Sequence, residues 1–390
     1  MTRALAVIDG EHYAPVVRDA LATVPYEVVA ALLVGGTEKL RGGDDYGVPL
    51  VASLTDVDVD VVLDVSDEPV LTPPARLRLA SHALALGMAY VGPDFRFDPP
   101  RFERVETPSL AVIGTGKRVG KTAVTTHAAR LFARDRDVVV VAMGRGGPRD
   151  PELVETPPTL DELLARSRAG EHAASDYLEV AVFAGVRTIG CRRAGGGLAG
   201  RVLDSNVSDG IALAETLAPD LIVFDGSGAA VPPVAADARV LVTGGAHDLD
   251  AYLNPYRVLI SDLVVLIGGG SVPEIKDVPV VRAELRLRPL DRPQGRVAVF
   301  TSGPAAVDHL DADVVHISRA LADRGALRDE LSRVDADTFV VELKAAAIDV
   351  VAEAADARGA CVVLAENELV PVDGDLDAAV FRLVPQEARV

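Results

Sequence analysis

Short runs of β-branched and other apolar residues recur along this chain, and each run is followed by Gly or Asp and then by a helical stretch. Near-continuous apolar strands that alternate with helices are typical of parallel sheets covered by helices on both faces. The sequence therefore predicts α/β architecture throughout its 390 residues. The expected strands include 5–8, 28–34, 61–65, 111–113, 138–143, 221–224, 240–243, 263–267, 297–300 and 362–364, and the expected amphipathic helices include 122–133 and 160–168.

Two breaks divide this pattern into three parts. Prolines cluster between residues 92 and 108, and a second Pro- and Gly-containing break lies near 289–295. We therefore expect an N-terminal Rossmann-like α/β domain on the substrate side at 1–104, a central domain with a parallel sheet at 105–290, and a smaller C-terminal α/β domain at 291–390.

The chain is acidic, with a formal net charge of −19. Phosphate backbones and anionic membranes attract basic surfaces, so this charge argues against a nucleic-acid or membrane partner. The two cysteines, Cys191 and Cys361, are too few for a disulfide framework. The sequence shows no signal-peptide pattern, and its apolar runs fall far short of the roughly 18 residues that span a bilayer. We expect a cytoplasmic protein.

The sharpest motif, Gly-Thr-Gly-Lys-Arg-Val-Gly-Lys-Thr, runs from Gly114 to Thr122 between a predicted strand and a predicted helix. Backbone N–H groups of such a loop converge on phosphate oxygens, and the helix N-terminus adds a favourable dipole potential. Lys121 is expected to reach the β- and γ-phosphates of ATP, and the Thr122 hydroxyl to ligate Mg²⁺. The expected ATP contacts in the loop are Gly114, Thr115, Gly116, Lys117, Arg118, Val119, Gly120, Lys121 and Thr122.

Two further observations bear on this loop. The usual pattern has Gly at the position of Thr115, and here Gly114 stands one residue further out. The chain has only five lysines among its 39 basic residues, yet two of them lie in this loop. The motif makes the central domain a P-loop NTPase-type domain, and the alternative is a glycine-rich turn that binds nothing.

An apolar strand ends in Asp225-Gly-Ser-Gly228. A carboxylate at the end of such a strand is expected to hold Mg²⁺, directly or through water, beside a phosphate loop. The N–H of Gly228 is expected to meet a γ-phosphate. Taken alone, Asp-Gly after a strand is also a common turn.

Two loops combine Gly with Arg, one from Gly144 to Arg149 and one from Gly190 to Arg201. Glycines permit close backbone approach, and Arg presents a planar fork to phosphate or carboxylate, so these loops are candidates for a second polyanion; the alternative is a pair of solvated surface loops. His172 and Asp176 are expected to share one helix, either as a surface pair or facing a site. Cys191 is expected to be a small packed residue rather than a nucleophile.

Polar side chains also follow the first strand, at Asp9, Glu11 and His12. The carboxyl edge of an α/β sheet is where ligands bind, so these residues are candidate ligand contacts. The competing interpretation is a tight turn capped by Asp9. Near the C-terminus, Glu342 and Lys344 are expected to form an ion pair or helix cap, and a substrate contact at Lys344 is the lesser alternative.

Taken together, several of these segments resemble the cyclic 2,3-diphosphoglycerate synthetase family. The resemblance extends from the first strand to about Lys344, and the loop itself resembles the dethiobiotin-synthetase and MinD branch of P-loop proteins. It implies that ATP and 2,3-diphosphoglycerate are converted to cyclic 2,3-diphosphoglycerate, ADP and phosphate, with Mg²⁺ and K⁺. The segments that carry it are 9–13, 114–122, 143–148, 170–177, 191–193 and 225–233.

The resemblance also implies roles for individual residues. Lys117, Lys121, Asp225 and Arg145 would be catalytic, and Thr122 and Asp225 would hold the metal. A homodimer, with Lys117 acting across its interface, is implied as well. The implied substrate contacts are Asp9, Glu11, His12, Arg145, Arg149, His172, Arg192 and Arg193.

Three alternatives stay open at the level of the sequence. One is another ATP-dependent ligase of the same P-loop branch, such as an enzyme like dethiobiotin synthetase. A second is a kinase that acts on the same glycerate without closing a ring. A third is a ParA-like nucleotide switch. The additional Arg-rich loops argue against this alternative, because they suit a second polyanionic substrate.

Overall fold

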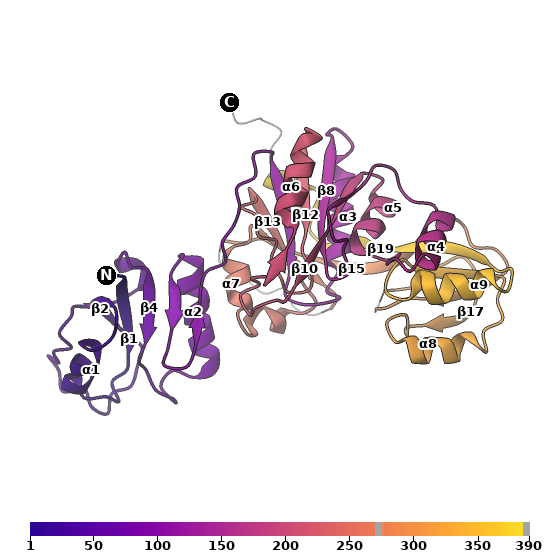
Figure 1. The fold of residues 1–390 in the computed structure, drawn as a ribbon. Helices are drawn as coiled ribbons and strands as arrows, with labels where there is room; N and C mark the ends of the chain where they lie inside the picture. The colour runs from indigo at the N-terminus through magenta and orange to yellow at the C-terminus, as the bar shows by residue number, and fades with distance from the viewer. Residues whose placement is uncertain (270–274, 276, 304, 385–390) are drawn as a thin grey trace. The chain divides into compact units, whose positions relative to one another are not determined.

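The computed structural model describes residues 1–269, 275, 277–303 and 305–384 (Figure 1). The described chain divides into two compact units: residues 1–101 with 247–260, and residues 102–246 with those after 260. Both units are α/β, as the sequence predicts. None of the described helices is long and apolar enough to cross a membrane.

The first unit is built on a sheet that has six strands in the described chain, in the order β3-β2-β1-β4-β5-β6. The pairs are parallel except β5 with β6. Helix α7 comes from the later segment and packs against α2. The elements are β1 (Arg3–Ile8), α1 (Ala14–Leu21), β2 (Glu27–Leu33), β3 (Leu50–Val51), β4 (Val61–Asp64), α2 (Pro73–Ala85), β5 (Ala89–Val91), β6 (Arg96–Phe97) and α7 (Asn254–Leu259).

The second unit contains one sheet with 13 strands among the described residues. The strand that leads into the phosphate loop, β7, lies between β12 and β13, and all the pairs from β10 through β8, β12, β7, β13 and β14 to β15 are parallel. Its strands are β7 (Ser109–Gly114), β8 (Val138–Gly144), β9 (Glu152–Val154), β10 (Arg187–Ala194), β11 (Asp204–Ser205), β12 (Leu221–Asp225), β13 (Ala238–Thr243), β14 (Leu263–Ile267), β15 (Val280–Pro289), β16 (Arg296–Phe300), β17 (Asp313–Ser318), β18 (Thr338–Glu342) and β19 (Cys361–Asp373).

Helices cover both faces of the parallel part of this sheet. Along β8, Val138 and Val140 pack into the cluster that holds helix α3, whereas Val139 and Val141 pack into the cluster that holds α6. Such two-sided burial explains why the strand is apolar at every position. The helices are α3 (Lys121–Phe132), α4 (Leu160–Arg168), α5 (Asp176–Ala184), α6 (Val207–Thr216), α8 (Arg324–Leu331), α9 (Glu353–Asp356) and α10 (Leu376–Leu383), with a π-helical segment at Ala347–Ala352.

Strand β15 connects the parallel sheet to the C-terminal strands. It runs parallel to β14 from Val280 to Ala283 and then extends beyond the end of β14 to Pro289. Strand β19 pairs antiparallel with it, and β18, β16 and β17 follow in parallel with β19. The direction of the strands therefore reverses at β15. The sheet continues across the domain boundary expected at residue 290, and that boundary stays a prediction.

The expected helices agree closely with the structure. Helix α4 covers 160–168 as predicted, because Thr159 and Glu162 form a capping box at its start and satisfy two backbone N–H groups. Helix α3 begins one residue before the expected start, directly after Gly120. All ten strands expected from apolar runs are present, with ends shifted by a few residues at most except for β19, which extends nine residues further than expected.

Gly210 of α6 tests how tightly that helix packs on the sheet. Replacing Gly by Ala inside a helix ordinarily stabilises it by about 1 kcal/mol. Here a Cβ at residue 210 would overlap Cys191 Sγ, so Gly210→Ala is expected to lower the free energy of unfolding by about 1–3 kcal/mol through overpacking. Denaturant unfolding of the two proteins measures this difference.

Cys191→Ala supplies the control, since it removes the sulfur that the new methyl group would meet. In that background the substitution at residue 210 is expected to cost much less or to stabilise. Equal losses in both backgrounds would show that the sulfur contact is not the reason.

Candidate functional site

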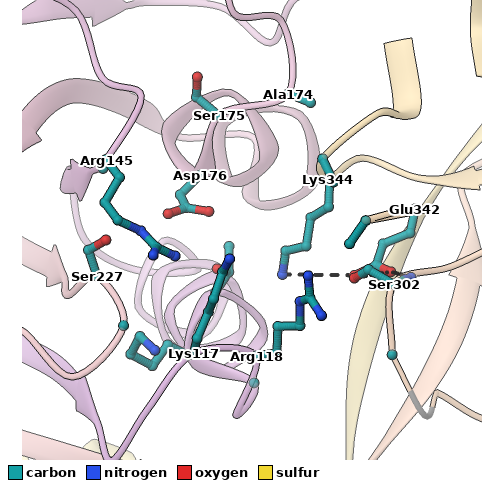
Figure 2. A pocket seen from close by; sticks show the side chains of 18 of the residues that line it. Lys117, Arg118, Arg145, Ala174, Ser175, Asp176, Ser227, Ser302, Glu342 and Lys344 are labelled. Carbon is teal, nitrogen blue, oxygen red and sulfur yellow. Dashed lines mark hydrogen bonds and ion pairs between the residues drawn. The ribbon is translucent and has the colours of Figure 1, made fainter. Parts of the chain in front are cut away.

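A cavity of about 370 Å³ lies within the second unit (Figure 2). The segments that follow β7, β8 and β12 line one side, and those that follow β16 and β18 line the other. The reversal of strand direction at β15 explains this geometry, because it turns the carboxyl ends of the two sets of strands toward each other. Its volume lies within the range of small-molecule sites, roughly 300–1,000 Å³.

The phosphate loop forms one wall. Its residues Lys117 to Thr122 line the cavity, whereas Gly114, Thr115 and Gly116 are not among the described lining residues. The Thr115 N–H donates to the Val242 carbonyl at 3.0 Å, which fixes the loop to β13. Gly120 adopts φ = +96° directly before α3, a backbone conformation that favours glycine. The loop thus positions the N-terminus of α3 at the cavity, as the sequence predicts.

Lys121 of this wall and Asp225 are both buried, with 7% and 1% of their surfaces accessible. Lys121 Nζ donates to the Gly116 carbonyl at 2.7 Å, and Asp225 accepts a hydrogen bond from the Thr125 hydroxyl at 2.9 Å. Burial lowers the pKa of Lys121, and the carboxylates of Asp225 and Asp176 oppose that shift. Burial and the charge of Asp176 raise the pKa of Asp225 while Lys121 opposes them. Each charge in this group therefore depends on the others.

The mouth of the cavity is positively charged. Lys117, Arg118 and Arg145 line it, and the charge of Arg145, together with burial and Arg118, lowers the pKa of Lys117. Figure 2 shows Arg145 and Asp176 directed toward the middle of the cavity. Like charges that repel one another in this way favour an anionic ligand, which would relieve the repulsion.

Gly147 explains why a glycine-rich segment follows β8. A Cβ at that position would overlap the Cys191 carbonyl oxygen, so the backbone can approach β10 only without a side chain. This approach presents Gly144, Arg145 and Gly146 to the cavity.

The other three arginines that were expected to contact substrate are not among the described residues that line the cavity. Arg193 donates to the carbonyls of Gly195 and Ser227, at 2.5 and 2.8 Å, and so braces the loop that carries Gly228. Arg149 and Arg192 are exposed side chains outside the lining. Gly226, Ser227 and Gly228 do line the cavity, and Asp225, which precedes them at the end of β12, is buried. The substrate roles of these three arginines stay predictions.

The expectation that His172 and Asp176 share one helix is wrong. Helix α4 ends at Arg168, Gly170 follows with φ = +82°, and α5 begins only at Asp176, so His172 lies in the connecting loop. The left-handed backbone at Gly170 is what separates the two helices. Both residues nevertheless line the cavity, His172 beside Gly146.

The N-terminal candidates lie in the first unit. Asp9 is fully buried and accepts hydrogen bonds from the N–H groups of Glu11 and Asp67, at 2.9 and 2.7 Å, and from His12 Nδ1 at 2.8 Å. Burial alone would raise the pKa of Asp9, but these hydrogen bonds lower it overall. Glu11 accepts from the N–H of Thr37. Asp9 thus holds the turn together, and the ligand-binding roles of Asp9, Glu11 and His12 stay predictions.

Sequence reasoning gave too little weight to the C-terminal wall of the cavity. Glu342, Lys344, Ser302 and Asn367 line it. Lys344 pairs with Glu179 of α5, with 3.3 Å between Nζ and Oε1, as well as with Glu342 at 3.9 Å. The rarity of lysine was the available signal, since Lys344 is one of only five in the chain.

A glycine loop between a strand and a helix, with an aspartate at the end of the neighbouring strand, defines a P-loop protein. Three family models bear out this class: the P-loop domain of cyclic 2,3-diphosphoglycerate synthetase matches residues 109–277, the N-terminal domain matches 3–98 and the C-terminal domain matches 296–368. The chain belongs to the cyclic 2,3-diphosphoglycerate synthetase family.

Curated relatives agree over nearly the full length. The chain is 45% identical to the cyclic 2,3-diphosphoglycerate synthetase of Rubrobacter xylanophilus, over 99% of this chain and 98% of that protein. Proteins of the same name from Pyrococcus furiosus and Thermococcus kodakarensis are 39% and 40% identical, over 97% of this chain. The crystal structure of LpxK from Aquifex aeolicus in complex with ATP aligns with a TM-score of 0.46 at 12% identity, over 73% of this chain and 91% of that one.

Cys191 is a packed residue, as expected: it is fully buried, and burial, together with Asp209, raises the pKa of its thiol to about 12. At pH 8 the thiol is therefore protonated and should resist alkylation, whereas Cys361 is exposed and should react. Mass spectrometry after brief iodoacetamide treatment is expected to find the label on Cys361, and on both cysteines after unfolding. Rapid labelling of Cys191 in the folded chain would contradict this packing.

Proposed function

We propose that this chain uses ATP to close 2,3-diphosphoglycerate into its cyclic anhydride, with release of ADP and phosphate. Family membership supports the reaction, because the curated relatives are named for it. The observation that carries the proposal is the cavity where a phosphate loop and further Lys and Arg side chains meet. Such a cavity suits two polyanions that must react with each other.

The proposed chemistry has two displacements. An oxygen of one substrate phosphate attacks the γ-phosphorus of ATP, a new P–O bond forms, and the bond to ADP breaks. An oxygen of the other substrate phosphate then attacks the activated phosphorus, which closes the ring and expels orthophosphate. Both nucleophiles are already anionic, so alignment and charge neutralisation do most of the work.

In this proposal the loop residues 114–122 and Gly228 bind ATP, with Lys121 on the terminal phosphates. Lys117 and Arg145, at the mouth of the cavity, would neutralise charge on the transferred group. Arg145 and His172 line the cavity where the second substrate would lie. Arg149, Arg192 and Arg193, and Asp9, Glu11 and His12 of the first unit, are proposed as further substrate contacts from their sequence positions alone.

The residues near the loop fit Mg²⁺. Among the described residues no cluster of three or more His, Cys, Asp or Glu side chains could hold a metal ion. Mg²⁺ does not need one, because it binds through one or two carboxylates together with substrate phosphates. Thr122 and Asp225 would supply a hydroxyl and a carboxylate oxygen, and the ion would supply neutralisation of phosphate charge.

Potassium, a homodimer and a cytoplasmic location complete the proposal. They rest on the resemblance to the family and, for location, on the low cysteine content. Light scattering on the purified chain tests the dimer, and exchange of K⁺ for Na⁺ in the assay tests the cation.

Phosphorus NMR distinguishes the open alternatives. Incubation with ATP, Mg²⁺ and 2,3-diphosphoglycerate is expected to yield the cyclic product and one orthophosphate for each ADP. A kinase would yield a linear phosphorylated product without orthophosphate. A nucleotide switch would hydrolyse ATP slowly and leave the glycerate unchanged.

Lys121→Ala tests the assignment of the phosphate loop. Loss of the buried ammonium is expected to reduce turnover by about a thousandfold or more, because a fixed positive charge on the terminal phosphates stabilises the transition state. The rate of cyclic product formation measures the effect, and the midpoint of thermal unfolding shows whether the fold survives. Arg134→Ala is the matched control, since this cation lies just after the same helix and is 67% exposed. Full activity of Lys121→Ala would refute the ATP assignment.

A further inference from the structure

Lys344 is held in an unusual position for a lysine. It lies in the segment after β18, its ammonium is between the carboxylates of Glu179 and Glu342, and the side chain is still 25% exposed toward the cavity that it lines. The two carboxylates are 4% and 1% exposed. Figure 2 shows Lys344 pointing into the cavity from the side opposite Arg145.

Glu342 does not need Lys344 as a hydrogen-bond partner. Its Oε2 accepts from the Thr301 hydroxyl and from the N–H and hydroxyl of Ser302, at 2.6–2.9 Å, and its Oε1 accepts from the Asn367 amide at 2.6 Å. These donors come from neighbouring strand segments, so Glu342 is a rigid support. Glu342 therefore positions Lys344, and the lysine ammonium stays available to a ligand.

Glu179 holds the ammonium from the other side. Burial raises the pKa of Glu179 well above its ordinary value, although Lys344 opposes that shift, and Glu179 Oε2 lacks any hydrogen-bond partner in the described chain. Burial alone would lower the pKa of Lys344, but Glu179, Glu342 and Asp176 raise it overall. The ammonium therefore stays charged and is only partly neutralised by Glu179.

The charge of Lys344 affects ionisable groups of the phosphate loop and its neighbouring strand. Its charge contributes to the lowered pKa of Lys121, and it also affects Asp225. Lys117, Arg118, Lys121 and Arg145 all come from the nucleotide side, whereas Lys344 is the one cation among the described lining residues after β15. An anion that bridges the two walls is the ligand such an arrangement fits.

We infer that Lys344 binds one of the two phosphates of 2,3-diphosphoglycerate. This inference rests on the proposed function and adds a substrate contact from the C-terminal part of the chain. A compact ammonium on a fixed support suits a single phosphate, since it acts as a point charge. Glu179 and Glu342 are positioning residues, because they act through Lys344.

Binding of 2,3-diphosphoglycerate to the full chain tests this contact. Calorimetry in the presence of Mg²⁺ and ADP is expected to show affinity reduced about ten- to a hundredfold by Lys344→Met, the range of a lost charge-assisted hydrogen bond. Lys344→Arg should restore part of it. ADP affinity should be unchanged. Arg324→Met is the control, because it removes a cation that pairs with Asp349 outside the cavity lining, and should change neither affinity.

Lys344→Met leaves Glu179 without its cation and can reduce stability for that reason. The double variant Lys344→Met with Glu179→Gln removes both charges, and should fold while binding the substrate as weakly as the single variant. Wild-type substrate affinity in that folded double variant would overturn the inference, and so would an equal loss of ADP affinity. If the unsubstituted chain neither binds nor converts 2,3-diphosphoglycerate, the proposed function itself fails and the inference with it.

Discussion

The antiparallel pairing of β15 with β19 is the interaction on which the rest of the second unit depends. Without it the P-loop strands and the C-terminal strands would be two separate sheets. Because β15 extends past β14 and β19 reverses the direction, strand ends that would otherwise lie at one edge come to face each other. The phosphate loop and Lys344 meet in one cavity for this reason.

Charge within that cavity is the second constraint. A chain with a net charge of −19 concentrates cations in this cavity, from the phosphate loop and the segments after β8 and β18, and neighbouring cations contribute to the lowered pKa values of Lys117 and Lys121. The carboxylates of Asp225 and Asp176 favour the charged form of Lys121, and Glu179, Glu342 and Asp176 favour that of Lys344. Without a ligand, the cavity thus has positive charge that its carboxylates do not fully neutralise, and phosphate groups would neutralise it. Burial acts separately: it lowers the pKa of Lys121 and raises that of Asp225, so it favours the neutral form of each.

The fold and the loop could be predicted because their signals are local. An apolar run bounded by Gly or Asp indicates a strand buried on both faces. The spacing of Thr159 and Glu162, which are three residues apart, indicates where α4 begins. Residues 114–122 are contiguous, so their spacing reveals the phosphate site. The C-terminal wall could not be found in this way, because the contact between Glu179 and Lys344 depends on a pairing of distant strands that no local pattern specifies. Arg193 shows a similar limit, since its hydrogen bonds to the Gly195 and Ser227 carbonyls could not be predicted from its sequence context, and its substrate role stays a prediction.

The hydrogen bond from Lys121 to the Gly116 carbonyl has a consequence for how the loop meets its ligand. An ammonium has three N–H groups, so this bond occupies one donor and leaves two for an incoming oxygen. The carbonyl thus orients the side chain before a ligand arrives, and less rotational freedom is lost when a phosphate oxygen binds the remaining donors. The attraction between the ammonium and that oxygen grows with the negative charge of the incoming group. A highly charged anion therefore gains more from this oriented lysine than a weakly charged solute does.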